Sequence, residues 1–211
     1  MIRGIIFDLD GVIVHTDEMH YRAWKQIAER IGVTFDREIN NRLRGVSRME
    51  SLEIILEGAK PVSAAEKLAL ADEKNAAYRK LLETLSERDV DGEVRTALRE
   101  LKERGVKLAI GSSSKNAGFI LGRIGLSGFF DAVSDGNNIT RSKPDPEVFL
   151  KAAEFLALKP SECAVVEDAC AGIDAAVAGG FYSVGIGDAS GYEKADMKIA
   201  RFAEVLNLID P

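Results

Sequence analysis

The sequence predicts an α/β protein: a doubly wound (Rossmann-like) parallel sheet core with an inserted all-helical cap domain. Four apolar runs have the length and composition of buried parallel strands, at residues 4–7, 106–110, 163–166 and 182–186. Amphipathic stretches lie between the second, third and fourth runs, at residues 115–124, 146–156 and 173–178. Strands that alternate with helices along the chain are typical of a doubly wound sheet with helices on both faces.

The segment after the first strand breaks this alternation. From about Asp17 to Val90 it contains several helical patterns and no convincing strand. Ser47 with Glu50 and Ser63 with Glu66 have the spacing of capping boxes, which predicts a helix start at each serine. We therefore expect residues 17–90 to form the cap, and residues 1–16 and 91–211 to form the catalytic core.

The later elements follow in the same order. The runs at 106–110, 163–166 and 182–186 each end in polar or glycine residues, as a strand does where it leaves a sheet. The Gly179-Gly180 pair is interpreted as the end of a helix before the last strand, because no glycine-rich phosphate-loop pattern occurs.

Composition excludes several classes of protein. With 211 residues, 46% hydrophobic and 29% charged, the chain has the profile of a globular protein with a sizeable core. A net charge of -6 and the lack of a basic stripe argue against nucleic-acid binding. Cys163 and Cys170 suggest neither a disulfide framework nor a zinc site, and both are expected to be small packing residues.

Hydropathy and periodicity set the expected location and assembly. The apolar stretch that ends at Asp8 is too short for a signal peptide, and no run approaches membrane-spanning length. No heptad pattern or additional apolar helix is evident. We expect a cytoplasmic monomer without a membrane or nucleic-acid partner.

Polar residues close the apolar runs, at the edge of the sheet where open α/β folds bind ligands. They are Asp8, Asp10, Ser112, Glu167 and Asp168, joined by Lys143 from a loop before a helix. Four acids in one crevice ionise together only when a hard cation with oxygen ligands is bound, and Mg²⁺ is the expected ion. A single acid at a strand end would be interpreted as a helix cap or a solvated loop residue. Four acids that converge on one crevice argue against that interpretation.

The same residues predict phosphoryl transfer. A metal, Lys143 and the hydroxyl of Ser112 would neutralise and hold a transferring phosphoryl group. Asp8 directly follows the strand and should be held rigidly, so it is the expected nucleophile for an aspartyl-phosphate intermediate. Asp10, on the same side of the extended backbone, is then free to act as general acid and base.

These residues resemble the four ordered motifs of the haloacid dehalogenase superfamily, and the motifs span the whole chain. They are Phe7-Asp8-Leu9-Asp10-Gly11-Val12, Ser112, Lys143-Pro144 and Glu167-Asp168. The cap is similar to that of the β-phosphoglucomutases through His20 with Trp24, the run from Leu43 to Arg48, Ser51, and Lys74-Asn75. The resemblance implies interconversion of β-glucose 1-phosphate and glucose 6-phosphate, with Mg²⁺ and a β-glucose 1,6-bisphosphate that serves as intermediate and activator.

The resemblance also implies roles for individual residues. Asp8 would be phosphorylated, and Asp10 would move the proton with support from Thr16 and His20. The metal would be held by the carboxylates of Asp8, Glu167 and Asp168 and by the carbonyl of Asp10. The phosphorylated sugar would be bound by Trp24, Gly45, Val46, Arg48, Ser51, Lys74, Ser112, Ser113, Ser114, Lys115, Asn116 and Lys143. Among these, Ser112, Ser113 and Lys143 would hold the transferring phosphate, and Arg48, Ser114, Lys115 and Asn116 the other one.

Some positions depart from the family pattern, and some residues have an ordinary alternative. The family usually has an acid at the position of His15, a lysine at Arg44, an alanine at Ser113 and a polar residue at Cys170. Arg44 can change the preferred sugar, because the hydrogen-bond geometry of arginine differs from that of lysine. From the residue pattern alone, His20, Arg48 and Lys74 would be exposed and Trp24 would lie in the core.

Two other functions share part of the pattern. A Mg²⁺-dependent sugar-phosphate phosphatase would have the same core motifs and differ only in the cap. A signalling phospho-receiver also clusters acids with a lysine, but its acceptor lies on a later strand and it lacks a helical insertion of roughly 70 residues.

Overall fold

The computed structural model describes residues 1–209, and its core is a six-stranded parallel sheet in the order β3-β2-β1-β4-β5-β6. The strands are β1 (Gly4–Phe7), β2 (Lys107–Gly111), β3 (Ala132–Ser134), β4 (Cys163–Glu167), β5 (Tyr182–Gly185) and β6 (Met197–Lys198). The four predicted strands are confirmed, with shifts of one residue at some ends. The strands β3 and β6 were missed because two or three residues are too few to show a periodicity.

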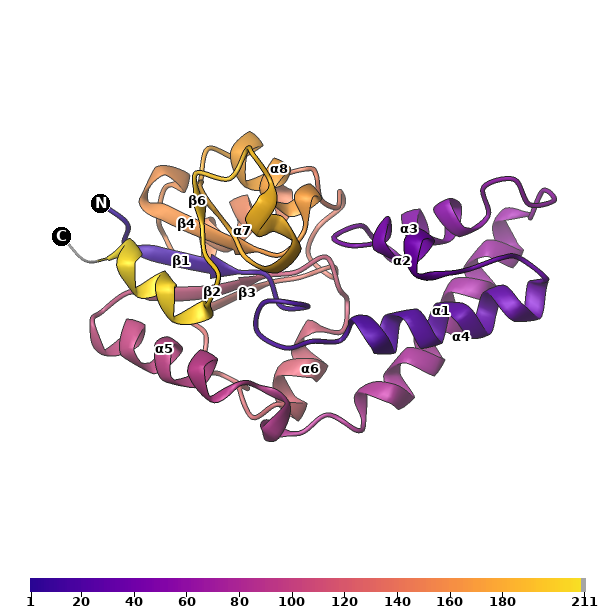
Figure 1. The fold of residues 1–211 in the computed structure, drawn as a ribbon, viewed down its shortest axis with the longest axis horizontal. Helices are drawn as coiled ribbons and strands as arrows, with labels where there is room; N and C mark the ends of the chain where they lie inside the picture. The colour runs from indigo at the N-terminus through magenta and orange to yellow at the C-terminus, as the bar shows by residue number, and fades with distance from the viewer. Residues whose placement is uncertain (210–211) are drawn as a thin grey trace.

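Helices cover both faces of the sheet, as the doubly wound prediction requires (Figure 1). They are α5 (Gly92–Glu103), α6 (Ala117–Arg123), α7 (Glu147–Phe155) and α8 (Cys170–Ala178). Side chains alternate along β1: Ile5 and Phe7 join one buried cluster with α5 and α6, and Ile6 joins the other with α7 and α8. Short 3-10 helices occur at Glu87–Asp89, Pro160–Glu162, Gly187–Gly191 and Phe202–Leu208.

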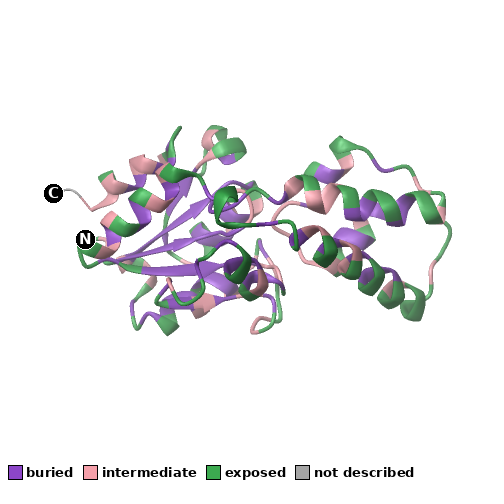
Figure 2. Cartoon of the chain, turned by 90° about the horizontal axis from the view of Figure 1, so that it is seen from below, coloured by how far each residue is buried: buried purple, intermediate pink, exposed green. Residues whose placement is uncertain are grey.

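A second helical lobe lies to one side of the sheet (Figure 1). It contains α1 (Asp17–Ile31), α2 (Arg37–Asn41), α3 (Arg48–Ile55) and α4 (Ala64–Leu82), and the structure has no strand between residues 17 and 90. The lobe has its own buried cluster, which includes Trp24 and Leu52, and buried residues are present in both lobes (Figure 2). The main cluster of the core also extends into the lobe through Ala23 of α1 and Leu82 of α4. The exact boundaries of the cap, 17–90, remain a prediction.

Local signals in the cap explain its helix ends. Ser47 and Ser63 each accept a hydrogen bond from the backbone N–H of the glutamate three residues later, whose side chain accepts from the serine N–H in return. Both predicted capping boxes are therefore confirmed. The Gly179-Gly180 pair ends α8 as predicted, but it precedes β5, which is followed by the short β6 and is not the last strand.

The linker from α4 to α5 is fastened to the core by two arginines. Arg123, at the end of α6, donates hydrogen bonds to the carbonyls of Glu83 (2.5 Å) and Leu85 (3.1 Å). Arg95 of α5 donates to the carbonyl of Glu87 (2.7 Å). The C-terminal end of α4 is thus tied to the core. No helix within residues 1–209 is long and apolar enough to cross a membrane.

Candidate active site

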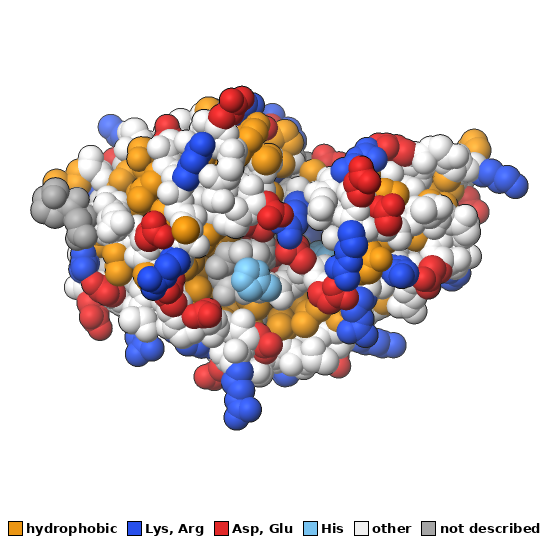
Figure 3. All heavy atoms as spheres, in the orientation of Figure 1, with side chains coloured by type: hydrophobic (Ala, Val, Ile, Leu, Met, Phe, Trp, Pro, Cys, Tyr) orange, Lys and Arg blue, Asp and Glu red, His pale blue; other side chains and the backbone are white. Residues whose placement is uncertain are grey.

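A cavity of about 1010 Å³ lies where the two lobes meet, at the carboxyl ends of β1, β2 and β4. Charged side chains of both signs gather at this junction on the surface (Figure 3). Every predicted site residue except Thr16 lines the cavity: Asp8, Asp10, His20, Trp24, Gly45, Val46, Arg48, Ser51, Lys74, Ser112, Ser113, Ser114, Lys115, Asn116, Lys143, Glu167 and Asp168. The structure therefore brings together residues that are up to 160 positions apart, from Asp8 to Asp168, in the chain.

Three buried acids form a compact group, which we call the carboxylate cluster: Asp8, Glu167 and Asp168. One oxygen of each lies within 4.8 Å of the others. Two glycines make the close approach possible. A Cβ on Gly11 (φ +96°) would lie 2.1 Å from Oδ2 of Asp168, and one on Gly172 would lie 1.9 Å from Cδ of Glu167.

Lys143 neutralises part of the carboxylate cluster. Its Nζ, on a fully buried side chain, donates hydrogen bonds to Oδ1 of Asp8 (2.5 Å) and to Oε1 of Glu167. Burial disfavours the charged amine, but the two carboxylates outweigh it and raise the pKa of Lys143 above its ordinary value. Lys143 is thus a permanent cation beside the proposed nucleophile.

Lys143 and Arg44, whose Nη1 lies 3.5 Å from Oδ2 of Asp168, supply two cations against three acids. Burial, reinforced by the charges of Glu167 and Asp8, raises the pKa of Asp168 to about 8. Burial also raises the pKa of Glu167 to about 7, against the opposing charge of Lys143. The three carboxylates do not readily ionise together, and their oxygens lie close enough to bind one ion. They are therefore suitable ligands for a hard divalent cation such as Mg²⁺, which would favour their charged forms.

The carboxylate of Asp10 is held apart from the cluster by two hydroxyl groups. Its Oδ1 accepts hydrogen bonds from the hydroxyl of Thr16 and from that of Tyr78 (3.4 Å). Thr16 is the N-cap residue of α1, but its side chain caps no helix N–H, so its hydroxyl is available to Asp10. Burial and the charge of Asp8 raise the pKa of Asp10 to about 7, where a group can both give and take a proton near neutral pH.

His20, Lys74 and Tyr78 pack together beside Asp10, on the cap side of the cavity. Nδ1 of His20 lies 2.9 Å from Nζ of Lys74, and the His20 and Tyr78 ring centroids are 4.0 Å apart. Burial and the neighbouring cations Lys74 and Arg48 hold the pKa of His20 well below its usual value. A neutral His20 can accept the hydrogen bond that Lys74 donates. Lys74 is buried, so the expectation of an exposed residue from its pattern alone is wrong.

A second basic group lines the cavity, consisting of Arg48, Ser114, Lys115 and Asn116. Arg48 is the first residue of α3, directly after the capping-box serine, and the other three lie in the loop between β2 and α6. Nη2 of Arg48 donates to Oδ1 of Asn75 (2.8 Å), which also accepts from Nδ2 of Asn116 (3.0 Å). Cap and core are therefore hydrogen-bonded to each other at this group. Within residues 1–209, no hydrogen bond or ion pair joins it to Lys143 or to the carboxylate cluster.

Residues 2–180 match the family model of the haloacid dehalogenase-like hydrolases. The chain belongs to this family. It is 41% identical over 207 residues to a β-phosphoglucomutase of Bacillus subtilis, covering 97% of this chain and 92% of the relative. A phosphorylated carbohydrates phosphatase of Thermotoga maritima is 30% identical, covering 85% of this chain and 82% of the relative.

A solved structure supports the same relationship. A crystal structure of β-phosphoglucomutase from Clostridium difficile superimposes with a TM-score of 0.92 at 38% identity and covers 97% of this chain and 93% of that one. The predicted membership of the haloacid dehalogenase superfamily and the resemblance to β-phosphoglucomutases are both confirmed. Haloacid dehalogenase-like enzymes use Mg²⁺, in agreement with the carboxylate cluster. The roles of the individual site residues remain predictions.

The positions where this haloacid dehalogenase-like chain departs from the expected pattern have clear places in the structure. Arg44 forms ion pairs with Asp17 (2.6 Å) and Asp188 (2.5 Å), and its Nη1 lies 3.5 Å from Asp168. The hydroxyl of Ser113 donates a hydrogen bond to the carbonyl of Gly45 (3.0 Å). Both residues therefore bind the cap loop that contains Gly45 to the core.

The remaining departures lie at the surface. His15 is exposed, in the segment before α1. Cys163 is buried in β4, as expected of a packing residue, but Cys170 is exposed as the first residue of α8. The expectation that Cys170 packs in the interior is therefore wrong, because the start of α8 faces solvent at that position.

Three residues of the site region escaped the sequence analysis: Tyr78, Arg79 and Asp188. Tyr78 follows Lys74 by one helical turn, a spacing that could have placed it beside His20. Arg79 and Asp188 contact residues far away in the chain, and no local pattern distinguishes them from solvated surface charges.

Proposed function

We propose that the chain is a sugar-phosphate mutase that interconverts β-glucose 1-phosphate and glucose 6-phosphate through a phospho-aspartate on Asp8 and a β-glucose 1,6-bisphosphate intermediate. The observation that carries the proposal is the presence of two separate basic groups in one cavity, Lys143 with the carboxylate cluster and the group around Arg48. A bisphosphate needs both, whereas a phosphatase needs only the first. The similarity to a β-phosphoglucomutase over almost the whole chain agrees with this interpretation.

The two half-reactions can be assigned to residues of this chain. When the bisphosphate is bound, an oxygen of Asp8 would form a bond to phosphorus while the bond from phosphorus to the sugar oxygen breaks. The carboxyl group of Asp10 would give its proton to that sugar oxygen. In the opposite half-reaction Asp10 would take a proton from a sugar hydroxyl as the hydroxyl attacks the phosphorus on Asp8.

Charge in the transferring group would be balanced locally. Mg²⁺ held by the carboxylates of Asp8, Glu167 and Asp168 and by the carbonyl of Asp10 would neutralise the phosphoryl oxygens. Lys143 contacts both Asp8 and Glu167 and would hold the same phosphate, together with the hydroxyls of Ser112 and Ser113. These contacts act on charge that develops at the reacting phosphorus.

The second phosphate would be bound by Arg48, Ser114, Lys115 and Asn116. Among residues 1–209, the guanidinium of Arg48 donates a hydrogen bond to Asn75 alone, which leaves further N–H donors for a phosphate. Sugar contacts would come from Trp24, Gly45, Val46, Ser51 and Lys74. With both phosphates held, cap closure would exclude the water that otherwise hydrolyses the phospho-aspartate.

The proposal also includes the activator, the oligomeric state and the location of the protein. We keep the bisphosphate as activator, a monomeric state and a cytoplasmic location as predictions. The alternative is a sugar-phosphate phosphatase, which uses water as the second acceptor. Its support is that a fructose-1-phosphate phosphatase of Escherichia coli is also a relative, 32% identical and covering 87% of this chain and 95% of its own length.

The test supplies Mg²⁺, β-glucose 1-phosphate and a trace of β-glucose 1,6-bisphosphate, and follows glucose 6-phosphate and free phosphate together. Stoichiometric glucose 6-phosphate that disappears in Asp8→Asn would establish the mutase. A predominance of free phosphate would establish the phosphatase instead. If neither product forms while Asp8 is still phosphorylated by acetyl phosphate, the chemistry stands and glucose is the wrong sugar.

A further inference from the structure

Arg79 is a cap residue that reaches the core beside the second basic group. It lies on α4, one helical turn after Asn75, and it does not line the cavity. Its guanidinium stacks on the ring of Phe119 in α6, with Cζ 4.2 Å from the ring centroid, and its Nη1 donates a hydrogen bond to Oδ1 of Asn116 (3.3 Å). Arg79 thus holds the proposed phosphate ligand Asn116 by its amide oxygen.

The amide of Asn116 is unusual for its position. Asn116 is the N-cap residue of α6, where an asparagine oxygen ordinarily accepts a hydrogen bond from an N–H of its own helix. Here the side chain makes no capping bond, and the oxygen accepts from Arg79 instead. An arginine has only donors, so its contact requires that the amide oxygen of Asn116 point toward Arg79 and that its NH₂ group point away from Arg79.

The orientation of the Asn116 amide in turn determines the orientation of the Asn75 amide. Nδ2 of Asn116 donates to Oδ1 of Asn75 (3.0 Å), and the same oxygen accepts from Nη2 of Arg48 (2.8 Å). With its oxygen held by two donors, Asn75 must direct its own NH₂ group elsewhere. Both Asn75 and Arg48 line the cavity, and within residues 1–209 nothing accepts a hydrogen bond from Nδ2 of Asn75.

We infer that Arg79 is a positioning residue for the second phosphate site. It sets the amide of Asn116, through it that of Asn75, and so presents the guanidinium of Arg48 and the NH₂ group of Asn75 as donors to a phosphate in the cavity. The inference rests on the proposed function only in taking that phosphate to be the unreacting group of a sugar bisphosphate. Arg79 itself touches neither the substrate nor the reacting atoms.

A purely structural role is the competing explanation, because stacking on Phe119 also ties α4 to α6. The two explanations differ in what they predict for binding. A structural role lowers the stability of the fold and leaves phosphate affinity unchanged in the folded protein. A positioning role weakens binding of a ligand that uses the second site.

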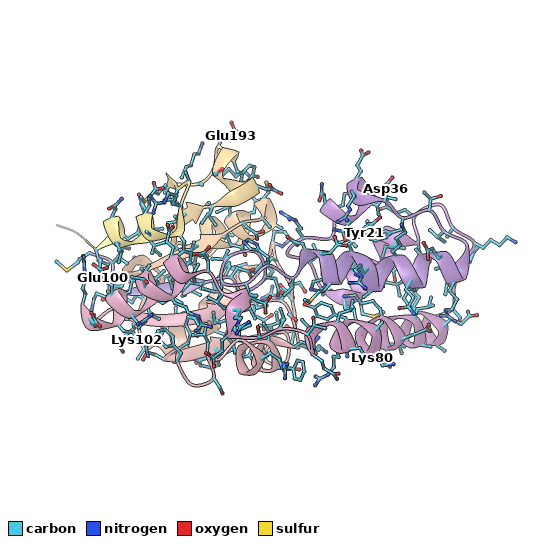
Figure 4. The ribbon with its side chains drawn as sticks, turned by 60° about the horizontal axis from the view of Figure 1, so that its bottom comes forward. Tyr21, Asp36, Lys80, Glu100, Lys102 and Glu193 are labelled. Carbon is cyan, nitrogen blue, oxygen red and sulfur yellow. The ribbon has the colours of Figure 1, made fainter. Side chains whose placement is uncertain are left out.

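The test compares Arg79→Met with Lys80→Met in the full chain. Both variants remove one positive charge from an exposed position of α4 and keep an aliphatic stem. Lys80 is labelled in Figure 4, and within residues 1–209 it makes no hydrogen bond or ion pair. Binding of β-glucose 1,6-bisphosphate is measured by calorimetry without Mg²⁺, so that no turnover occurs. We expect Arg79→Met to raise Kd about tenfold and Lys80→Met to change it less than about twofold.

A third variant tests whether the planar guanidinium group itself is needed. Arg79→Lys keeps a donor for Asn116 but lacks the planar group, and it should recover part of the lost affinity. In the mutase assay, Arg79→Met should raise KM for β-glucose 1-phosphate more than it lowers kcat. Equal Kd values for Arg79→Met and Lys80→Met would overturn the inference.

A second measurement needs no sugar. The side-chain NH₂ signals of Asn116 in nitrogen-15 spectra, assigned by their loss in Asn116→Ser, should shift in Arg79→Met and stay unchanged in Lys80→Met. Unchanged signals in both variants would reject the positioning role. If wild-type protein fails to bind the bisphosphate while the signals shift as expected, the proposed function fails and the positioning of Asn116 by Arg79 stands.

Discussion

The hydroxyl of Thr16 donates a hydrogen bond to Oδ1 of Asp10, across the point where the chain passes from the core into the cap. The contact ties the orientation of the proposed general acid and base to the first residue before α1. A movement of α1 would therefore change the orientation of the Asp10 carboxyl group.

Replacement of Thr16 by valine tests this relationship. Valine has nearly the same shape but no hydroxyl, so Asp10 would lose one of its two hydrogen-bond donors. We expect kcat for the mutase reaction to fall about 10- to 100-fold, less than the roughly 10²- to 10⁴-fold ascribed to a whole acid or base because Asp10 itself is kept, with little change in KM. Thr96→Val is the control, because the Thr96 hydroxyl donates its hydrogen bond to the Gly92 carbonyl within α5, away from the site. Similar kcat values for the two variants would show that the contact is incidental.

Gly11→Ala should disable the metal site without unfolding the protein. Gly11 has φ +96°, and an added Cβ would lie 2.1 Å from Oδ2 of Asp168, so the carboxylate must move. Gly58→Ala is a matched control, because φ is +77° and a Cβ there meets nothing within 4 Å. Both variants should lose about 1 kcal/mol or more of stability from the left-handed backbone. Loss of Mg²⁺ binding, measured by calorimetry, is expected for Gly11→Ala alone.

Mg²⁺ should stabilise the folded chain through the carboxylate cluster. Addition of a saturating concentration, about 100 times Kd, should raise the unfolding free energy by about 2.7 kcal/mol, since the ion binds only the folded state. Asp168→Asn should remove most of the increase. Glu193→Gln, a change at the outer surface of the core (Figure 4), should leave it intact. An increase in Asp168→Asn equal to that of the wild type would place the ion elsewhere.

Lys74 predicts a pH dependence of stability. Burial, reinforced by the charge of Arg48, lowers its pKa to about 7 in the folded protein from an ordinary 10.5. Between these values the unfolded chain binds more protons than the folded one, so this group makes the unfolding free energy rise with pH, by up to about 1.4 kcal/mol per pH unit. Its burial is most costly below pH 7.

The measurement is denaturant unfolding of the wild type and Lys74→Met, without Mg²⁺, at several pH values from about 7 to 9. The difference between the two unfolding free energies should shift in favour of the wild type as the pH rises. Lys80→Met supplies the reference for loss of an exposed amine. Parallel curves for wild type and Lys74→Met would mean that Lys74 keeps its ordinary pKa.

Much of the fold and the site could be predicted from the sequence because the relevant signals are local. Buried parallel strands are continuous apolar runs, and their polar closing residues must meet at one edge of the sheet. That reasoning placed Asp8, Glu167 and Asp168 together, as the structure does. The strands β3 and β6 were missed because they are too short for a pattern and are defined by their neighbours.

Contacts between cap and core could not be predicted from local signals. Arg79 and Asp188 are ordinary surface charges in the sequence, and their partners Asn116 and Arg44 lie 37 and 144 residues away. Such residues can be recognised only when the two lobes are placed against each other.

The hydrogen bonds from Arg123 hold the C-terminal end of α4 against the core, and we expect that end to act as a pivot when the cap moves. At about 1.5 Å per residue, Arg79 is roughly 6 Å from Glu83 along the helix, and Asn75 roughly 12 Å. A swing of about 10° would displace Arg79 by about 1 Å and Asn75 by about 2 Å. The contact between Asn75 and Asn116 would therefore be displaced about twice as far as the contact between Arg79 and Asn116, so the two halves of the phosphate site would separate most at Asn75.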